Sequence, residues 1–322
     1  MKIGIPRALL YYYYYPFFET FFKELGCEVV LSEETNAKII SDGCKVTVSE
    51  LCVPIKIFNG HVVSLMNKNV DYIFVPRFIS IGKEWYCPKF IGLGEIVKYS
   101  IDSMKDKMLI VELKNKTDIP DRIEDYMPLA EKLNVTKAQL KNALKKAKIS
   151  FLKCRKLSLQ GYTIPEAYSI LKGKEVPPPM QKADLTIGLM GYVNNVYDDF
   201  VSMSAVKKLR EMGVKVITFD MLDENIIKLD KSKGKQPFWT FARKVYNAAN
   251  YFINNVEIDG IIHLTAFACG PDSVIGKMME LECGEKDIPF MTIRIDEHTG
   301  ESHVQTRFEA FTDMLKMRKG AK

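Results

Sequence analysis

The strongest constraint on the fold of this chain is an alternation of strand-like and helix-like segments that recurs in both halves of the sequence. Strands are predicted at Lys2–Pro6, Glu28–Leu31, Val70–Pro76 and Lys107–Leu113, and again at Leu185–Met190, Val214–Phe219, Gly260–Leu264 and Phe290–Ile295. Helical patterns lie between them, among them Ser49–Asn67, Gly92–Ser103, Val201–Met212 and Pro271–Leu281. Such alternation favours parallel, doubly wound sheets. We therefore expect an α/β protein with two Rossmann-like doubly wound parallel-sheet domains.

The segment between the two halves has a different character. Residues from about 120 to 172 read as helical, and the run Pro177-Pro178-Pro179 follows them. A proline run of this kind is typical of a domain boundary. We predict an N-terminal α/β domain over 1–118, a helical segment and linker over 119–180, and a C-terminal α/β domain over 181–322.

Composition and charge exclude several classes of protein. Hydrophobic residues make up 47% of the 322 residues and charged residues 27%, which excludes a disordered or collagen-like chain. The apolar stretch Ala8–Phe18 is too short to span a bilayer and contains Pro16. Seven cysteines are an odd number and too few for a disulfide framework. We therefore expect a cytoplasmic protein with no membrane segment.

The net charge of +6 comes from one segment of the chain. Between Lys132 and Lys174 there are 11 Lys and Arg residues and one acidic residue, Glu166. Thr136 and Gln139 form a capping box, so the segment is predicted to be a helix. It is either the solvated face of a packed helix or a docking surface for an acidic partner. We do not expect nucleic-acid binding, because neither interleaved aromatic residues nor a known module accompanies the charge.

Three of the seven cysteines lie where an open α/β sheet binds ligands, beyond the carboxyl ends of its strands. Cys87 follows the strand Val70–Pro76, Cys269 follows the strand Gly260–Leu264, and Cys52 opens a helix on the same rim. Pro or Gly-Pro follows Cys87 and Cys269, so that helix N–H groups can point back at the sulfur. A helix N-terminus lowers the pKa of a thiol, and we expect this for these cysteines.

Spacing alone leaves the role of the three cysteines open. The sequence has no Cys-x-x-Cys pair, which excludes a local zinc ribbon or ferredoxin motif. Three thiolates from two domains suit a [4Fe-4S] cluster with one open iron, and the alternative is three unrelated buried thiols. Among the other four, Cys27, Cys154 and Cys283 are expected to be structural, while Cys44, in a short connection beside Gly43, is ambiguous.

Polar residues follow other strands of both domains. Asn195 and Tyr197 follow the strand Leu185–Met190. They form a pocket wall, or alternatively the segment is a helix cap with Asp198 or Asp199 near the N-terminus of the helix. Arg7, directly after the first strand, binds either an anion or a surface carboxylate. We predict that Arg7, Asn195 and Tyr197 contact substrate.

The loop after the last strand is rich in groups that transfer protons. Glu297, His298 and Glu301 lie within five residues there, and they are our predicted catalytic residues. The alternative for Glu301 is that it caps the final helix.

Five stretches resemble the signatures of one family. They are Ile3–Tyr12, Glu50–Lys56 with Gly60-His61, Tyr86–Phe90, Phe267–Ser273, and Asp296–Glu301 with Gln305–Arg307. Together they resemble the acyl-CoA dehydratase activase-related proteins, which are related to 2-hydroxyacyl-CoA dehydratases and contain a domain of unknown function. The resemblance runs from residue 1 to about residue 315.

The resemblance implies an iron–sulfur protein. The dehydratase subunits and the related double-cubane reductases hold clusters through cysteines in comparable loops between Rossmann-like domains. Carried over, Cys52, Cys87 and Cys269 would ligate one [4Fe-4S] cluster, and a double-cubane cluster would need further ligands, such as Cys44. Electrons would come from a separate ATP-hydrolysing activase. This chain has no P-loop and no GxGxxG after its first strand, so it would be the acceptor of those electrons.

Three functions remain open from the sequence. The first is a component that reduces or activates a small substrate, such as an acyl-CoA, at the cluster. The second is a non-catalytic assembly or regulatory subunit of such a system, and the third is a cluster-free acyl-CoA-binding protein. The substrate is open as well, and because related subunits pair, a homodimer is one expectation for the oligomeric state.

Overall fold

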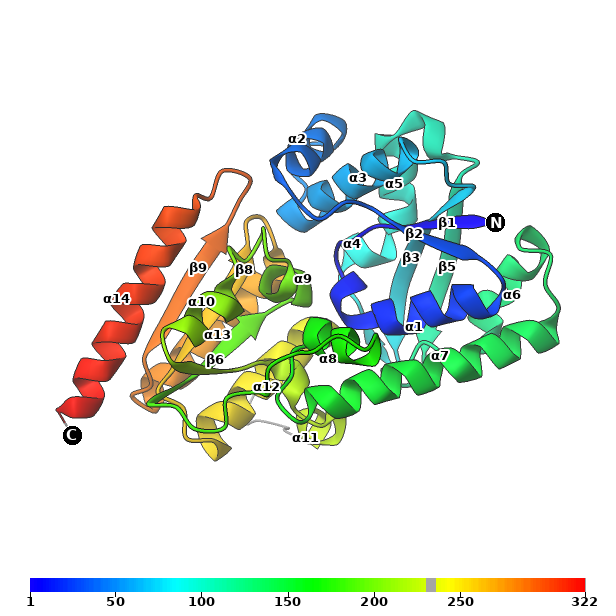
Figure 1. Cartoon of the computed structure of the whole chain (residues 1–322). Helices are drawn as coiled ribbons and strands as arrows, with labels where there is room; N and C mark the ends of the chain where they lie inside the picture. The colour runs from blue at the N-terminus through cyan, green and yellow to red at the C-terminus, as the bar shows by residue number, and fades with distance from the viewer. Residues whose placement is uncertain (230–235, 322) are drawn as a thin grey trace. The chain divides into compact units, whose positions relative to one another are not determined.

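A computed structural model of the chain describes residues 1–229 and 236–321 (Figure 1). Contacts divide the chain into two compact units, unit 1 (Met1–Cys154) and unit 2 (Arg155–Lys322). Each unit has its own sheet with helices around it, as the alternation of segments predicts. Within the described ranges, no helix is long and apolar enough to cross a membrane.

Unit 1 is built on a mostly parallel sheet. Its strands are β1 (Lys2–Ile5), β2 (Glu28–Leu31), β3 (Tyr72–Ile81), β4 (Glu84–Trp85) and β5 (Met108–Asn115). The order is β2-β1-β3, with β5 beside β3 and the short β4 antiparallel to the end of β3. Lys2 pairs with Glu28, and Ile3 pairs with Tyr72. The switch point of this sheet, where the winding reverses, therefore lies between β1 and β3.

Unit 2 repeats the same order of parallel strands. Its strands are β6 (Leu185–Gly191), β7 (Val214–Ile217), β8 (Gly260–Ala266) and β9 (Phe290–Ile295), in the order β7-β6-β8-β9. Ile187 pairs with Gly260, which places the switch point between β6 and β8. Cys87 and Cys269 thus follow equivalent strands, β3 and β8, in the two units.

Helices connect the strands in both units. Those up to β5 are α1 (Tyr11–Glu24), α2 (Ala37–Val46), α3 (Val53–Met66), α4 (Pro88–Ile91), α5 (Leu93–Ser100) and a short 3-10 turn, η1 (Asp102–Met104). Between β5 and β6 lie α6 (Ile123–Lys132), α7 (Lys137–Ser158) and α8 (Ile164–Leu171). Those after β6 are α9 (Val193–Tyr197), α10 (Ala205–Glu211), the 3-10 turn η2 (Phe219–Met221), α11 (Glu224–Leu229), α12 (Thr240–Asn255), α13 (Gly270–Glu285) and α14 (Glu301–Gly320).

The helical segment predicted over 119–180 contains α6, α7 and α8, and the division between the two units falls inside α7. The capping box of α7 is present, because the N–H of Gln139 donates to Thr136 Oγ1 over 3.2 Å and the N–H of Thr136 donates to Gln139 Oε1 over 2.8 Å.

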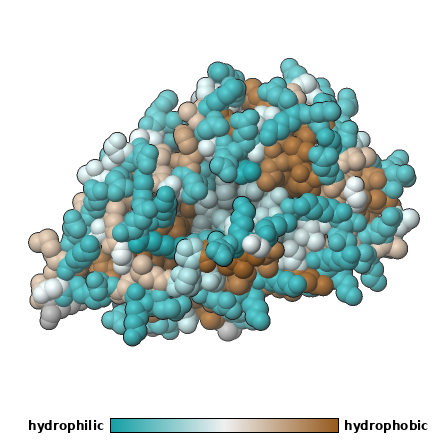
Figure 2. Space-filling model, viewed as in Figure 1, coloured by the Kyte–Doolittle hydropathy of each residue, from teal (hydrophilic) through white to brown (hydrophobic). Residues whose placement is uncertain are grey.

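Lysines of α7, including Lys141, Lys145 and Lys153, are exposed. Hydrophilic side chains predominate on the face drawn in Figure 2, with hydrophobic areas scattered among them.

The strand β3 continues past Pro76, where the sequence predicted its end. Ile73 donates its N–H to Lys107 O beside β5, so by alternation position 76 faces the opposite side. On that side β1 pairs with β3 only at Tyr72 and Ile73, so the missing N–H of Pro76 costs no ladder hydrogen bond. Cys87 consequently follows a longer strand and the β3–β4 hairpin.

The prediction that Cys44 lies in a short connection is wrong, because Cys44 belongs to α2. Asn36 caps this helix by accepting the N–H of Ile39 over 3.0 Å. Gly43 of α2 and Gly60 of α3 let the two helices approach backbone to backbone. A Cβ on Gly43 would collide with Lys56 O, and a Cβ on Gly60 would collide with Ile39 O.

Candidate functional site

The three cysteines singled out from the sequence share one local structure. Cys52 is the N-cap of α3, Cys87 the N-cap of α4 and Cys269 the N-cap of α13, and each helix has a proline at its first or second position. Proline is favoured there because its fixed φ suits a helix and its missing N–H is not needed. The proline fixes where each helix starts, and the thiol therefore lies at the helix N-terminus, where backbone N–H groups are free to bind it.

Cys52 and Cys87 both belong to unit 1, and their thiols are close enough to influence one another. Burial raises the pKa of Cys52 to about 11, although the N–H of Ile55 lowers it, and the Cys87 thiol raises it further. Burial also raises the pKa of Cys87, against the N–H groups of Phe90 and Lys89. The ammonium group of Lys89 lowers the pKa of both thiols.

The expectation that the helix N-terminus makes these thiols acidic is therefore wrong for the metal-free chain. Both thiols are largely buried, and the loss of water around the charged form outweighs the nearby N–H groups. The sequence shows the helix start but not the depth of burial.

Cys269 belongs to unit 2, where a tight turn precedes it. Its N–H donates to Ala266 O over 3.1 Å, and Ala268 in the middle of the turn has φ +61°, a conformation that favours glycine. Cys269 is half-buried, and Phe267, two residues earlier, is 58% exposed. All seven cysteines lie in the described ranges, and none of them forms a disulfide.

No three His, Cys, Asp or Glu side chains within residues 1–229 and 236–321 come together as a metal site. Cys52 and Cys87 belong to unit 1 and Cys269 to unit 2. A set of all three thiols therefore needs ligands from both units.

The remaining cysteines are mostly structural. Cys154 and Cys283 are 1% and 0% exposed, and burial raises the pKa of Cys283 to about 12. Cys27 is buried too, and burial raises its pKa. The structural assignments of Cys27, Cys154 and Cys283 agree with this burial, whereas Cys44 is only half-buried.

A buried carboxylate near Cys87 was missed in the sequence. Asp118, which is 4% exposed, follows β5 and accepts hydrogen bonds from the hydroxyls of Tyr13 (2.5 Å) and Tyr14 (3.0 Å). The Tyr14 hydroxyl also lies 3.4 Å from that of Tyr86, the residue before Cys87. The rule about carboxyl ends of strands would have found Asp118, had it been applied to the loop after β5.

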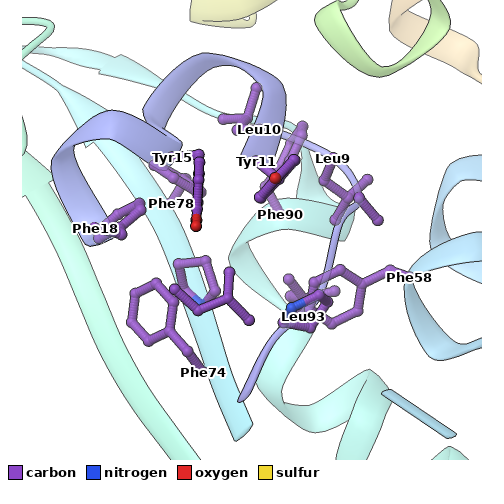
Figure 3. Close-up of a pocket in the computed structure, with 14 residues that line it drawn as sticks. Leu9, Leu10, Tyr11, Tyr15, Phe18, Phe58, Phe74, Phe78, Phe90 and Leu93 are labelled. Atoms are coloured by element: carbon purple, nitrogen blue, oxygen red, sulfur yellow. The ribbon is translucent and has the colours of Figure 1, made fainter. Parts of the chain in front are cut away.

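A small apolar cavity of about 20 Å³ lies at the switch point of unit 1 (Figure 3). Its wall includes Phe58 of α3, Phe90 of α4, and Tyr11 and Tyr15 of α1. The helices α3 and α4 begin at Cys52 and Cys87, two of the predicted cluster ligands. Its volume is enough for about one water molecule, so no acyl chain fits. A second hollow of about 250 Å³ beside β7 is lined by none of the predicted site residues.

The predicted substrate contacts of unit 2 are engaged within the unit. The Tyr197 hydroxyl donates to Asp220 Oδ1 over 2.6 Å and lies 2.8 Å from Thr218 Oγ1. Asn195 is 1% exposed, and its amide group donates to Leu264 O over 3.3 Å and to Asp272 Oδ2 over 3.4 Å. Their contact with substrate stays a prediction.

Arg7 contacts a surface carboxylate and keeps one donor without a partner among the described residues. It forms an ion pair with Glu34 (3.1 Å) through Nη1, and its N–H donates to Ser32 Oγ over 2.9 Å. Its Nε atom is buried and has no partner among the described residues. A free donor of this kind is compatible with an anionic substrate group, which stays a prediction.

Of the predicted catalytic residues, Glu297 and His298 lie in the loop between β9 and α14, and Glu301 is the first residue of α14. Glu301, at the start of α14, is exposed and forms an ion pair with Lys208 over 2.6 Å, which lowers the pKa of its carboxyl group. His298 is exposed and Glu297 is half-buried. Asp296 organises the loop by accepting the N–H of His298 and the hydroxyl of Thr299. The catalytic role of Glu297, His298 and Glu301 is not tested by this geometry.

Comparison with protein-family models decides the family. The model of the CoA enzyme activase uncharacterised domain matches residues 2–222, which include Cys52 and Cys87. The chain belongs to this family. The model of the 2-hydroxyglutaryl-CoA dehydratase D-component matches residues 199–315, which include Cys269 and the loop with Glu297, His298 and Glu301. A comparison with curated proteins yields no match.

The two matches confirm the resemblance read from the five sequence motifs. This one chain matches both the CoA enzyme activase family and the dehydratase D-component. It is therefore activase-related and 2-hydroxyacyl-CoA dehydratase-like. The two models overlap over residues 199–222, around α10 and β7.

Proposed function

We propose that this protein is an electron-accepting iron–sulfur component of a CoA-enzyme system, with Cys52, Cys87 and Cys269 as ligands of one [4Fe-4S] cluster. The observation that carries the proposal is the shared local structure of these cysteines, each the N-cap of a helix that begins with a proline. None of the other four cysteines, which all lie in the described ranges, is the N-cap of a helix.

The donor set fits an iron–sulfur cluster. Cysteine thiolates are the usual ligands, and N–H groups directed at the sulfur atoms stabilise their negative charge. The N–H groups of Lys89, Phe90 and Ile55 act in this sense on Cys87 and Cys52, and so does the Lys89 ammonium group. Binding of iron removes the proton of a thiol, so the raised thiol pKa values belong to the metal-free chain.

When bound, such a cluster would supply one-electron transfer and, with three protein ligands, an iron free to bind a small substrate. The chain's own residues would bind and protonate that substrate. Arg7 would hold an anionic group of the substrate through its free Nε–H. Asn195 and Tyr197 would form a wall, and Glu297, His298 and Glu301 would hold or deliver protons.

The electron donor in this proposal is an ATP-hydrolysing activase. The match to the CoA enzyme activase family supports a partner of this class. The substrate class is a small molecule such as an acyl-CoA, which the match to the dehydratase D-component supports. The proposed location is the cytoplasm, where thiols stay reduced.

The experiment that tests this proposal is anaerobic isolation followed by iron and sulfide analysis. We expect about four iron and four sulfide per chain, a brown absorbance, and reduction that depends on the activase and ATP. Cys87→Ser should lose the cluster, whereas Cys27→Ala, at a buried thiol away from the helix starts, should keep it. A chain that cannot be reconstituted, or a Cys87→Ser variant with full iron, would contradict the proposal.

A second candidate is a non-catalytic assembly or regulatory subunit that keeps the cluster. The observation in its favour is that the Tyr197 hydroxyl and the Glu301 carboxylate already have partners within the protein. Turnover of an acceptor that requires the activase and ATP would favour the catalytic component, and a loaded cluster without any turnover would favour the subunit.

A further inference from the structure

A cluster of buried polar side chains lies at the switch point of unit 2. Asn195 comes from α9, which follows β6, and Asp272 comes from the first turn of α13, which follows β8. His263 lies within β8 itself. The exposed fractions of Asp272, His263 and Asn195 are 0%, 0% and 1%, so the group is shielded from water. We call these three residues the Asp272 cluster.

The carboxylate of Asp272 joins the other members. His263 Nε2 lies 3.1 Å from Asp272 Oδ1, and the Asn195 amide group donates to Asp272 Oδ2 over 3.4 Å. An ionised carboxylate only accepts hydrogen bonds, so with Asp272 ionised the donor in this contact is the Nε2–H of His263. Asn195 also donates to Leu264 O over 3.3 Å, and it accepts from the amide of Asn194 over 2.7 Å. The side chain of Asp272 thereby joins α9, β8 and α13 at the carboxyl edge of the sheet.

The imidazole of His263 packs directly against α13. A Cβ on Gly276, in the second turn of that helix, would lie 2.5 Å from His263 Cε1 and 2.6 Å from Nδ1. Nδ1 has no hydrogen-bond partner among the described residues, and the helix backbone covers it. Two contacts with His263 therefore hold α13 against β8, namely the hydrogen bond to Asp272 and the packing on Gly276.

The backbone turn that leads into Cys269 is strained and has to be stabilised by the structure around it. Ala268 holds a φ of +61°, which costs a residue with a Cβ free energy that the surrounding structure must offset. On one side the N–H of Phe267 donates to Ile295 O over 2.8 Å. On the other side, the turn ends at Cys269, the N-cap of the helix that the Asp272 cluster anchors three residues later.

We infer that the Asp272 cluster is a positioning device that holds Cys269 at the start of α13 in the geometry needed to bind a metal cluster. This inference rests on the proposed role of Cys269 as a cluster ligand. In this role Asp272, His263 and Asn195 act through Cys269, and the proposed contact of Asn195 with substrate is separate from it.

The first test measures the accessibility of Cys269 in the metal-free, full-length chain. Asp272→Asn keeps the size of the side chain but leaves only one acceptor oxygen for two donors. We expect iodoacetamide to alkylate Cys269 roughly five to ten times faster than in the unchanged chain, as expected for the loss of one buried hydrogen bond. Cys87, in unit 1, is the internal reference, and mass mapping of peptides reports both sites.

A matched pair of glycines on α13 provides the control. Gly276→Ala pushes against His263 and should accelerate alkylation of Cys269, whereas Gly284→Ala meets no atom within 4 Å and should leave it unchanged. If Gly276 acts through His263, the double variant His263→Ala with Gly276→Ala should alkylate no faster than His263→Ala alone. Far-ultraviolet circular dichroism and melting of each variant show whether the fold is kept.

The second test reads the cluster after reconstitution. We expect Asp272→Asn and Gly276→Ala to change the electron paramagnetic resonance spectrum of the reduced cluster or to lower its iron content, and Gly284→Ala to match the unchanged chain. Unchanged alkylation together with an unchanged spectrum in Asp272→Asn and Gly276→Ala would overturn the inference. If the unchanged chain holds no cluster, the proposed function fails, and the alkylation rates alone decide whether the Asp272 cluster holds Cys269.

Discussion

At the scale of single residues, burial decides which charges the protein tolerates. His61 of α3 is 0% exposed, its Nε2 lies 3.0 Å from Thr35 Oγ1, and its Nδ1 has no partner among the described residues. Burial, with Arg7 nearby, lowers the pKa of His61 from 6.5 to about 3. The folded chain therefore keeps His61 neutral at acidities where the unfolded chain binds a proton.

The consequence is a loss of stability in acid. Because the pKa of His61 is lower in the folded state, its neutral form favours folding above pH 6.5, and this contribution disappears as the pH falls from 6.5 towards 3. We expect the free energy of unfolding of His61→Gln to depend less steeply on pH in that range. Denaturant titrations at several pH values measure it. The unchanged chain, titrated in the same way, is the comparison, and an equal slope in both would contradict this expectation.

Lys89 is the residue whose charge should matter most to a bound cluster. It lowers the pKa of both Cys52 and Cys87, and it forms no ion pair with any described residue. Reduction adds a negative charge, which a nearby ammonium group stabilises. We expect Lys89→Met to shift the midpoint potential of the cluster to more negative values by roughly tens of millivolts. Lys83→Met, at an exposed lysine of the β3–β4 hairpin, should leave the potential unchanged in the same redox titration.

Residue patterns in the sequence predicted part of the candidate site around Cys52, Cys87 and Cys269. The three thiols could be placed at helix starts because cysteine, proline and strand ends are visible in the sequence. The direction of their pKa shifts could not be predicted, because it depends on burial by residues distant in the sequence. His263 gave no local signal of its role, since it acquires that role through Asp272, which only the fold brings near. The only local signal of Asp118 was its place after a strand, because its tyrosine partners are distant in the sequence.

At the scale of elements, the crossing of α2 and α3 should be the contact least tolerant of added volume. Gly43 and Gly60 each face a backbone carbonyl of the other helix. A backbone carbonyl cannot move aside as the end of a flexible side chain can. We expect Gly43→Ala and Gly60→Ala to lower the free energy of unfolding by about 1–3 kcal/mol or more. Gly284→Ala, in open space on α13, should not lower it, and chemical denaturation compares the three.

Elements with a strong pattern were predicted closely, and elements without one were missed. Glu28–Leu31 and Phe290–Ile295 are strands with the predicted bounds. The helix α2 was missed because glycine and polar residues interrupt its pattern, although Asn36 is a good N-cap. The extension of β3 was missed because a proline normally ends a strand, and only the pairing of neighbouring strands shows that this one is tolerated.

At the scale of the whole molecule, a cluster with ligands from two units should couple their unfolding. Each unit has its own sheet and core, and thus the means to unfold separately. We expect calorimetry to show one transition for the cluster-loaded protein and two for the metal-free protein. Binding to the folded state should also raise the melting temperature. Two transitions at the same temperatures with and without the cluster would contradict ligation from both units.

The division of the three cysteines between the units has a consequence for biosynthesis. Cys52 and Cys87 leave the ribosome with unit 1, which ends at residue 154, whereas Cys269 is made 182 residues after Cys87. At ordinary rates of translation this interval lasts about 10 to 35 s. A cluster delivered during that time would find only two of its protein ligands. The proposed cluster would therefore be completed only after Cys269 has been made, and products truncated before Cys269 would remain colourless even if their first unit folded normally.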